Sequence, residues 1–194
     1  PEGDRRAQVV LNGKALRSEE AAAYMANRGS LLPSVIEAFE RLKSAHGLVI
    51  IEGAGSPAEV NLRRGDIANM GFARAADVPV VLVGDIDRGG VIASLVGTRT
   101  VIEADDSEMI AGFVINRFRG DETLFADGVR FIEDCCSWRC FGIVPWLQCA
   151  ARLPAEDAVV LGHAMPASGA ILIAVPMLSR ISNFDDLDPL RAEP

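Results

Sequence analysis

The sequence has few of the features that mark a membrane, secreted or metal-thiolate protein. No stretch reaches the roughly 18 uninterrupted apolar residues that a membrane helix needs, and the N-terminus does not resemble a signal peptide. Only two histidines, His46 and His163, are present, and none of the cysteines has the CxxC spacing of a zinc site. We therefore expect buried free thiols in a reducing cytoplasm, at Cys135, Cys136, Cys140 and Cys149.

Lysine is also scarce, because Lys14 and Lys43 are the only lysines among 19 basic residues and the others are arginine. The formal net charge of −8 argues against nonspecific binding of nucleic acid. Genomic base composition explains the arginine bias as readily as function does. Arginine is nevertheless the residue best suited to two-point binding of carboxylates and phosphates.

No GxxxxGK[ST] phosphate loop occurs in the 194 residues. The single Gly-Lys pair, Gly13-Lys14, continues with Ala-Leu. If the chain belongs to a nucleotide-binding domain, we expect the phosphate loop to lie upstream of Pro1. No Ser-His-Asp or Cys-His arrangement for nucleophilic catalysis stands out either.

Short apolar runs rich in Val and Ile recur along the chain, and such runs are typical of strands covered on both faces. Helical patterns alternate with them. This alternation predicts right-handed βαβ units and an α/β fold with a doubly wound, mostly parallel sheet. The predicted strands are Leu48–Ile51, Pro79–Gly84, Ile110–Asn116, Cys140–Pro145 and Ala170–Val175.

The helical patterns have recognisable starts. Residues 31–45 place their apolar side chains on one stripe, and Asp66 is a suitable N-cap for a helix that begins at Ile67. Further helices are expected after Gly89–Gly90 and over about residues 121–137. Residues 151–169 are rich in Pro, Ala and Gly and are interpreted as a connector to a second α/β domain.

Polar residues follow the predicted strands at the points where these strands end. Ligands of open parallel sheets bind beyond the carboxyl ends of the strands, so these residues predict a site on one rim of the sheet. Each residue alone is more often a turn former or a helix cap. The segments are Glu52–Ser56, Gly84–Gly90, Asn116–Asp121 and Pro145–Leu147.

Each residue type on this rim suits a part of a magnesium nucleotide. Glu52 is the predicted ligand of Mg²⁺, which binds few protein oxygens beside phosphate and water. The amide of Asn116 can pair with the adenine edge. Close backbone approach and anion binding at a helix start are expected at Gly53, Gly55, Gly89 and Gly90. The charge of an anionic ligand would be offset by Arg63, Arg64, Arg88, Arg117 and Arg119.

These segments together resemble the cobyric acid synthase family, the glutamine-hydrolysing ligases of cobalamin biosynthesis. The resemblance rests on IIEGAGSPAEVNLRRGDIANMGFA, VPVVLVGDIDRGGVIASLVGT, GFVINRFRGD, FGIVPWL and RLPAED, which occur in this order. It covers essentially the whole chain. It implies a P-loop domain related to dethiobiotin synthetase, followed by a class I glutamine amidotransferase-like domain.

The resemblance also implies an activity and residue roles. The family uses ATP, Mg²⁺ and glutamine-derived ammonia to amidate the b, d, e and g carboxylates of adenosylcobyrinic acid a,c-diamide through acyl phosphates. Glu52 matches the magnesium-binding acid, Asn116 the adenine-reading asparagine and Pro145 the other side of the adenine site. The DIDRGG motif places Asp85, Asp87 and Arg88 near substrate and phosphates.

The resemblance divides the chain into residues 1–154 of the amidoligase domain, a linker over 155–169, and the start of the amidotransferase domain over 170–194. The phosphate loop and the glutaminase cysteine and histidine are missing, so we expect the 194-residue chain alone to be inactive. Rival readings are cobyrinic acid a,c-diamide synthase, dethiobiotin synthetase and a partition-type P-loop ATPase switch. The sequence leaves the oligomeric state open.

Overall fold

The computed structural model describes residues 6–152. These residues fall into two units, and nearly all of them belong to the larger one, Glu2–Trp146. The short 3₁₀ helix η4 (Gln148–Arg152) belongs to the other unit. The predicted strand at 170–175 and most of the predicted connector lie outside the described residues.

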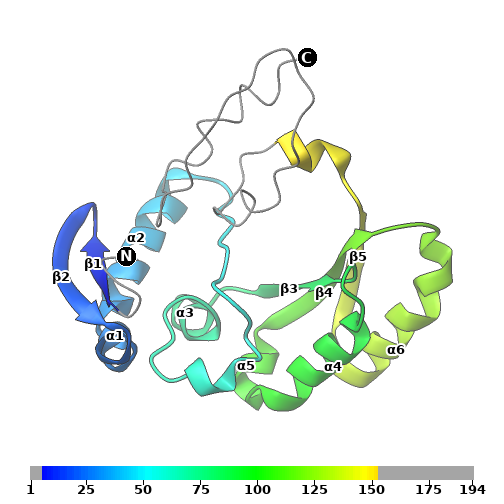
Figure 1. The fold of residues 1–194 in the computed structure, drawn as a ribbon, viewed down its shortest axis with the longest axis horizontal. Coiled ribbons are helices and arrows are strands. Elements are labelled where there is room, and N and C mark those ends of the chain that lie inside the picture. The colour runs from blue at the N-terminus through cyan, green and yellow to red at the C-terminus, as the bar shows by residue number, and fades with distance from the viewer. Residues whose placement is uncertain (1–5, 153–194) are drawn as a thin grey trace, which may run out of the picture. The chain divides into compact units, whose positions relative to one another are not determined.

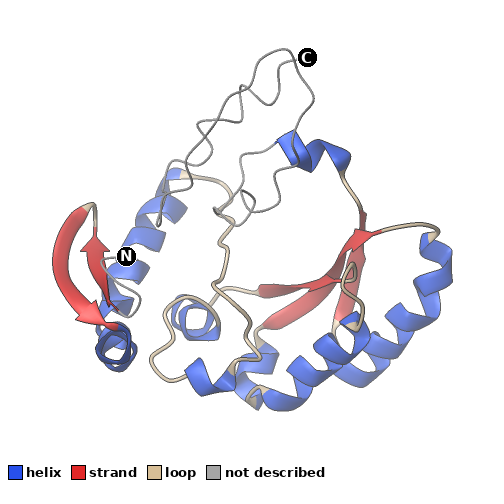
Figure 2. Cartoon of the chain, in the orientation of Figure 1, coloured by secondary structure: helices blue, strands red, loops and turns tan. Residues whose placement is uncertain are grey.

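A three-stranded parallel sheet lies at the centre of the larger unit (Figures 1 and 2). Its strand order is β3 (Val80–Asp85), β4 (Ile110–Phe118) and β5 (Arg139–Pro145). All three match predicted apolar runs, and helices connect them. The predicted α/β fold with a parallel sheet is thus confirmed. The connecting elements are α4 (Val91–Val101), α5 (Ala104–Glu108), η3 (Glu122–Phe125) and α6 (Ala126–Cys136).

The main core lies between this sheet and helices α4 and α6, which cover the same side of it (Figure 1). Phe113 and Ile115 of β4 are completely buried there. Successive strand side chains point to opposite faces of a sheet. On the other face, Val81 and Val83 of β3 are 46% and 65% exposed. Helices α4 and α6 contribute Val91, Leu95, Ile132 and Cys136 to this core.

The predicted strand at Leu48–Ile51 is wrong for the described part of the chain. These residues form no regular element, and Leu48 and Ile50 are 77% and 87% exposed. A strand requires hydrogen bonds to a neighbour, and among residues 6–152 β3 pairs only with β4. Glu52 therefore does not follow a strand.

The N-terminal part adds a hairpin that the sequence analysis does not predict. Strands β1 (Arg6–Leu11) and β2 (Lys14–Glu20) pair antiparallel. Asn12 and Gly13 connect them with φ values of 50° and 76°. Two positive φ values are typical of the type I′ turn that Asn-Gly favours.

Three helical elements follow the hairpin, namely α1 (Ala21–Asn27), η1 (Arg28–Leu31) and α2 (Leu32–Ala45). Helix α2 confirms the helix predicted over 31–45. Its buried Phe39 packs edge-on against Phe72 of α3 (Met70–Ala76), with ring centres 5.5 Å apart. This contact joins α2 to the helix that directly precedes β3.

Helix α3 begins at Met70 rather than at the predicted Ile67. Asp66 still satisfies backbone donors of this turn, because its carboxylate accepts hydrogen bonds from the N–H groups of Ala68, Asn69 and Gly71. These bonds hold residues 66–69 in a turn and delay the start of the helix. The 3₁₀ helix η2 (Val60–Leu62) lies upstream of this turn.

All four cysteines are free, as predicted, but the prediction that they are buried is wrong for three of them. Only Cys136 is buried, whereas Cys135 and Cys149 are exposed and Cys140 is half-buried. Adjacent residues of a helix point in different directions, so Cys135 faces away from the core that holds Cys136. Burial raises the pKa of the Cys136 thiol. None of the described helices has the length and apolar character needed to span a membrane.

Candidate functional site

The carboxyl ends of β3 and β4 bring Asp85 and Asn116 side by side. These residues are partners in the parallel register. The backbone N–H of Ile86 continues the pairing by donating to the Asn116 carbonyl at 3.1 Å. Asp87 follows two residues after Asp85, and its backbone N–H donates to the Asp85 carboxylate at 2.9 Å. The structure thus gathers three of the predicted site residues, Asp85, Asp87 and Asn116, at one edge.

Two arginines, one near the end of β4 and one just after it, reach back to these carboxylates. Nη1 of Arg117 lies 3.1 Å from Oδ2 of Asp85, and Nε of Arg119 lies 2.9 Å from Oδ1 of Asp87. All four side chains retain access to solvent. Exposed ion pairs contribute little to folding. The arrangement therefore provides two guanidinium groups that are held in place and still have N–H groups directed to solvent.

Trp146 extends this edge beyond β5. The guanidinium carbon of Arg119 lies 3.6 Å from the centre of the Trp146 ring, and that of Arg117 lies 5.3 Å from it. The Trp146 N–H donates to the Phe118 carbonyl at 2.8 Å, which fixes its backbone beside β4. Trp146 belongs to the predicted rim segment Pro145–Leu147, although no individual role is predicted for it.

A bulge in β4 directs these side chains. Ile115 pairs with Ile143 and Phe118 pairs with Pro145, so two residues of β4 lie opposite one residue of β5. Arg117 sits in the bulge with φ of 62°, in the left-handed region that non-glycine residues seldom adopt. The Asn116 side-chain oxygen accepts the Arg117 N–H at 2.9 Å. The same pairing brings Pro145, the predicted adenine-site residue, to the rim.

The environment of Asp85 favours its ionised form. The hydrogen bond from the Asp87 N–H is the main cause of a lowered pKa at Asp85, and Arg117 lowers this pKa further. The positive charge of Arg88, which is exposed, acts in the same direction. Asp85 is thus suited to accept hydrogen bonds or bind a cation, and it does not suit the role of a general acid near neutral pH.

Gly89 and Gly90 leave the space before the N-terminus of helix α4 free of neighbouring atoms. Their φ values are 77° and 75°, and a Cβ added to either would meet no atom within 4 Å. Gly90 occupies the N-cap position, and no side chain caps the helix there. The first N–H groups of an uncapped helix attract an anion. The predicted helix after Gly89–Gly90 is confirmed, and its start lies on the same loop as Asp85 and Asp87.

The loop that carries Glu52 is exposed and is shaped by its glycines. A Cβ on Gly53 would collide with the side-chain oxygen of Asn69, and Gly55 has φ of 70°. Among the described residues, no hydrogen bond or ion pair joins Glu52 to Asp85 or to the other rim residues. The place of Glu52 at the site therefore stays a prediction.

A small cavity lies beside this loop. Its volume is about 80 Å³, and Ala54, Ser56, Asp66 and Asn69 are among the residues that line it. This volume corresponds to a few water molecules and is too small for a nucleotide. The cavity shows that residues 54–56 lie against the turn that precedes α3.

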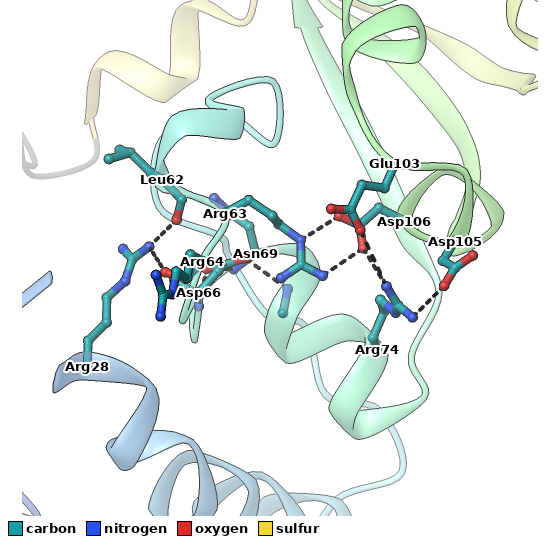
Figure 3. Close-up of polar contacts among 12 residues, drawn as sticks. Arg28, Leu62, Arg63, Arg64, Asp66, Asn69, Arg74, Glu103, Asp105 and Asp106 are labelled. Atoms are coloured by element: carbon teal, nitrogen blue, oxygen red, sulfur yellow. Dashed lines mark hydrogen bonds and ion pairs between the residues drawn. The ribbon is translucent and has the colours of Figure 1, made fainter. Parts of the chain in front are cut away.

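A network of ion pairs lies beside this turn (Figure 3). Arg63 binds Asp106 of α5 through Nε and Nη2, at 2.5 and 2.8 Å. Arg74 of α3 lies 3.5 Å from the same carboxylate and 2.7 Å from Asp105. Arg63 is predicted to offset the charge of an anionic ligand. In the structure its Nε and Nη2 bind the two carboxylate oxygens of Asp106 instead, so this prediction is wrong for the described residues.

The segment directly before the turn, residues 62–64, is held by the N-terminal helical region. Arg28 donates to the carbonyls of Leu62 and Arg64 (Figure 3). Sequence reasoning missed Arg28, Asn69 and Asp106. Their partners lie 15 to 43 positions away along the chain, so no local pattern identifies them.

Comparison with known proteins places these features in context. The chain is 62% identical to the cobyric acid synthases of Rhodobacter capsulatus and Paracoccus denitrificans over 194 residues, and 59% identical to that of Rhizobium meliloti over 195 residues. Each match covers 100% of this chain and 40% of the relative. The chain thus spans less than half the length of the curated relatives it matches. No solved structure matches it.

A family model described as an AAA domain matches residues 8–152. This range includes the parallel sheet, the loop after β3 and the end of β5, so the match covers both the fold and the candidate site. The similarity to cobyric acid synthases extends over the same segments. The chain belongs to this AAA domain family, AAA_26, with its P-loop-type α/β fold.

Proposed function

We propose that this chain is part of a ligase that amidates a corrinoid in cobalamin biosynthesis, as a cobyric acid synthase does. The proposal draws on the names of its relatives, which are 58–62% identical over the whole chain. The main structural support for it is that Asp85, Asp87 and Asn116 lie together at one edge of the sheet, beside the uncapped start of helix α4. Such an edge suits an adenine nucleotide and an anionic substrate.

The proposed reaction consumes ATP and glutamine-derived ammonia. A substrate carboxylate oxygen attacks the γ-phosphorus of ATP and forms an acyl phosphate, while ADP leaves. Ammonia then attacks the acyl carbon, loses a proton and expels inorganic phosphate, which carries one oxygen of the former carboxylate. The b, d, e and g carboxylates of adenosylcobyrinic acid a,c-diamide are the proposed substrate groups.

The residues of the rim would bind and orient these reactants. The Asn116 amide would read the adenine edge, with Pro145 on the other side of the base. Gly89 and Gly90 would expose the first N–H groups of α4 to phosphate oxygens. The proposed reaction needs positioning and charge stabilisation and no protein nucleophile.

Charged side chains would complete the site. Asp85 and Asp87 hold Arg117 and Arg119 in place, as their ion pairs indicate. Arg88 lies exposed at the start of the glycine pair and would meet an anionic oxygen of substrate or nucleotide.

Magnesium is the metal proposed for this site, with the Glu52 carboxylate as its protein ligand. Glu52 offers an exposed carboxylate on a loop whose glycines leave its backbone accessible, and Mg²⁺ binds through one or two carboxylates together with phosphate and water. When bound, the ion would neutralise charge on the phosphate oxygens. Glu52 is exposed and has no described partner at the rim, so the longer protein would have to bring the loop and the nucleotide together.

We further propose that residues 1–154 belong to the amidoligase domain, that 155–169 form a linker and that 170–194 begin a glutamine amidotransferase-like domain. The exposed apolar side chains of Leu48 and Ile50, and of Val81 and Val83, support additional protein around the sheet. In the full-length protein, a strand paired with residues 48–51 would give Glu52 the predicted position at a strand end.

An isotope experiment tests the proposed reaction. The full-length protein receives ATP, glutamine and a corrinoid whose side-chain carboxylates carry ¹⁸O, and mass spectrometry follows the products. We expect one ¹⁸O in inorganic phosphate for each amide formed. Amide formation without label in phosphate would contradict the acyl phosphate. Failure to bind the corrinoid, combined with nucleotide-dependent dimerisation, would instead favour an ATPase switch.

Other ligases are the nearest alternative. Cobyrinic acid a,c-diamide synthase and dethiobiotin synthetase would share the strand-end acid. Comparing the a,c-diamide corrinoid with cobyrinic acid and with 7,8-diaminononanoate as substrates distinguishes them. The proposed function requires amidation of the first compound.

A further inference from the structure

The loop after Glu52 is held by a single side chain from the turn before α3. Nδ2 of Asn69 donates to the Ala54 carbonyl at 2.6 Å. The Asn69 side chain approaches Gly53 so closely that a Cβ on this glycine would collide with it. Gly53 is therefore needed for this contact with Asn69 as well as for an open loop backbone.

The orientation of Asn69 is itself fixed by Asp66. One carboxylate oxygen of Asp66 accepts the N–H groups of Ala68 and Asn69, at 2.9 and 3.1 Å, and the other accepts that of Gly71 at 2.8 Å. Gly71 has no room for a Cβ, which would collide with the Asp66 carbonyl. The turn thus presents Asn69 to the loop in one conformation.

The turn is anchored to helix α5 through Arg63. The Asp66 N–H donates to the Arg63 carbonyl at 3.1 Å, and the Arg63 guanidinium binds Asp106, which is 1% exposed (Figure 3). Hydrogen bonds from Arg63 are the main cause of the lowered pKa of Asp106. Asp106 lies in α5, directly before β4. Two-point pairing of a buried carboxylate leaves little freedom for the turn.

We propose that Asn69 is a positioning residue for the loop that carries Glu52, and that the Arg63–Asp106 pair anchors the turn that presents it. The contacts connect Ala54 to the start of β4, the strand whose other end carries Asn116. Asn69 thereby fixes the loop backbone next to the carboxylate proposed to hold magnesium. This inference rests on that proposed role of Glu52.

The test measures the Mg²⁺ concentration for half-maximal amidation by the full-length enzyme. Asn69→Ala removes the bond to Ala54, and Asn69→Asp removes the donor while keeping the side-chain shape. We expect both to raise this concentration by about 10-fold or more, as changes behind a metal ligand do. The KM for glutamine should be unchanged in both variants. A general folding defect would not alter the Mg²⁺ requirement alone, so this combination of results separates a positioning role from misfolding.

Asn61→Ala is the matched control, since Asn61 lies in the same segment, is exposed, and its side chain makes no hydrogen bond to any described residue. Glu52→Gln separates the two proposals. If Glu52→Gln raises the Mg²⁺ requirement and neither Asn69 variant does, the positioning role is overturned and the magnesium role of Glu52 stands. If Glu52→Gln has no effect, the magnesium role fails and the inference fails with it. Hydrogen exchange should also accelerate at residues 54–56 in Asn69→Ala but not in β4, and unchanged exchange there would overturn the inference.

Discussion

The guanidinium carbon of Arg119 lies over the Trp146 ring, 3.6 Å from its centre. The same arginine binds Asp87 through Nε at 2.9 Å. Trp146, which follows β5, and Asp87, which follows β3, thus both contact the side chain of Arg119, which follows β4. The three strand ends of the sheet are connected at this point.

We predict that Trp146→Leu raises the KM for ATP about two- to fivefold in the full-length enzyme. An exposed cation–π contact contributes about 0.5–1 kcal/mol, and its loss would release Arg119 and the backbone beside Pro145. Steady-state kinetics measures the change. Phe131→Leu is the control, because Phe131 is an exposed aromatic residue of α6 away from the rim. Equal effects of both variants would argue against a role of Trp146 in the site.

Asn116→Ala should reduce the preference for ATP over GTP by about 10-fold, because a two-point amide–base contact contributes about 1–3 kcal/mol of discrimination. The measurement is the ratio of kcat/KM for the two nucleotides. Asn61→Ala serves again as the control. A preserved ratio in Asn116→Ala would exclude adenine recognition by this side chain.

Arg63→Ala should lower the free energy of unfolding by about 3 kcal/mol, because it leaves the buried Asp106 carboxylate without its two-point partner. Urea denaturation measures the change. The matched control is Arg41→Ala, whose partner Glu37 lies one helical turn away at 2.9 Å on the surface. There we expect a loss of no more than about 0.5 kcal/mol. Similar losses in both variants would show that the Arg63–Asp106 pair is not a special anchor.

The stability of the protein should fall in acid partly through Asp106. Its pKa in the folded state is lowered below the ordinary 3.8, chiefly by Arg63. The unfolded state therefore binds the proton more readily, so this contribution is present above about pH 4 and is lost as the pH falls through the folded-state pKa. Asp106→Asn should be less stable at pH 6 and should lose less stability between pH 5 and pH 3. Parallel curves for the two proteins would contradict this.

The exposed apolar run at residues 48–51 is a place where the local sequence pattern predicts a strand and the structure has none. Val- and Ile-rich runs predicted β3, β4 and β5 correctly, because each of them has a neighbour to bond with. Leu48–Ile51 has the same composition but no partner strand in the described part of the chain. Composition indicates which segments can form strands, whereas pairing requires a second strand in space.

The parallel α/β sheet and the start of α4 after Gly89–Gly90 could be predicted from local patterns in the chain. The meeting of Asp85 and Asn116 could be predicted as well, because residues that end neighbouring parallel strands lie at one edge of the sheet. The tertiary structure alone decided that Arg63 binds Asp106 rather than facing a ligand, and that Asn69 reaches Ala54. Strand and helix periods are local properties of the chain. Contacts between segments 15 or 43 residues apart depend on how the elements pack, and no local pattern encodes them.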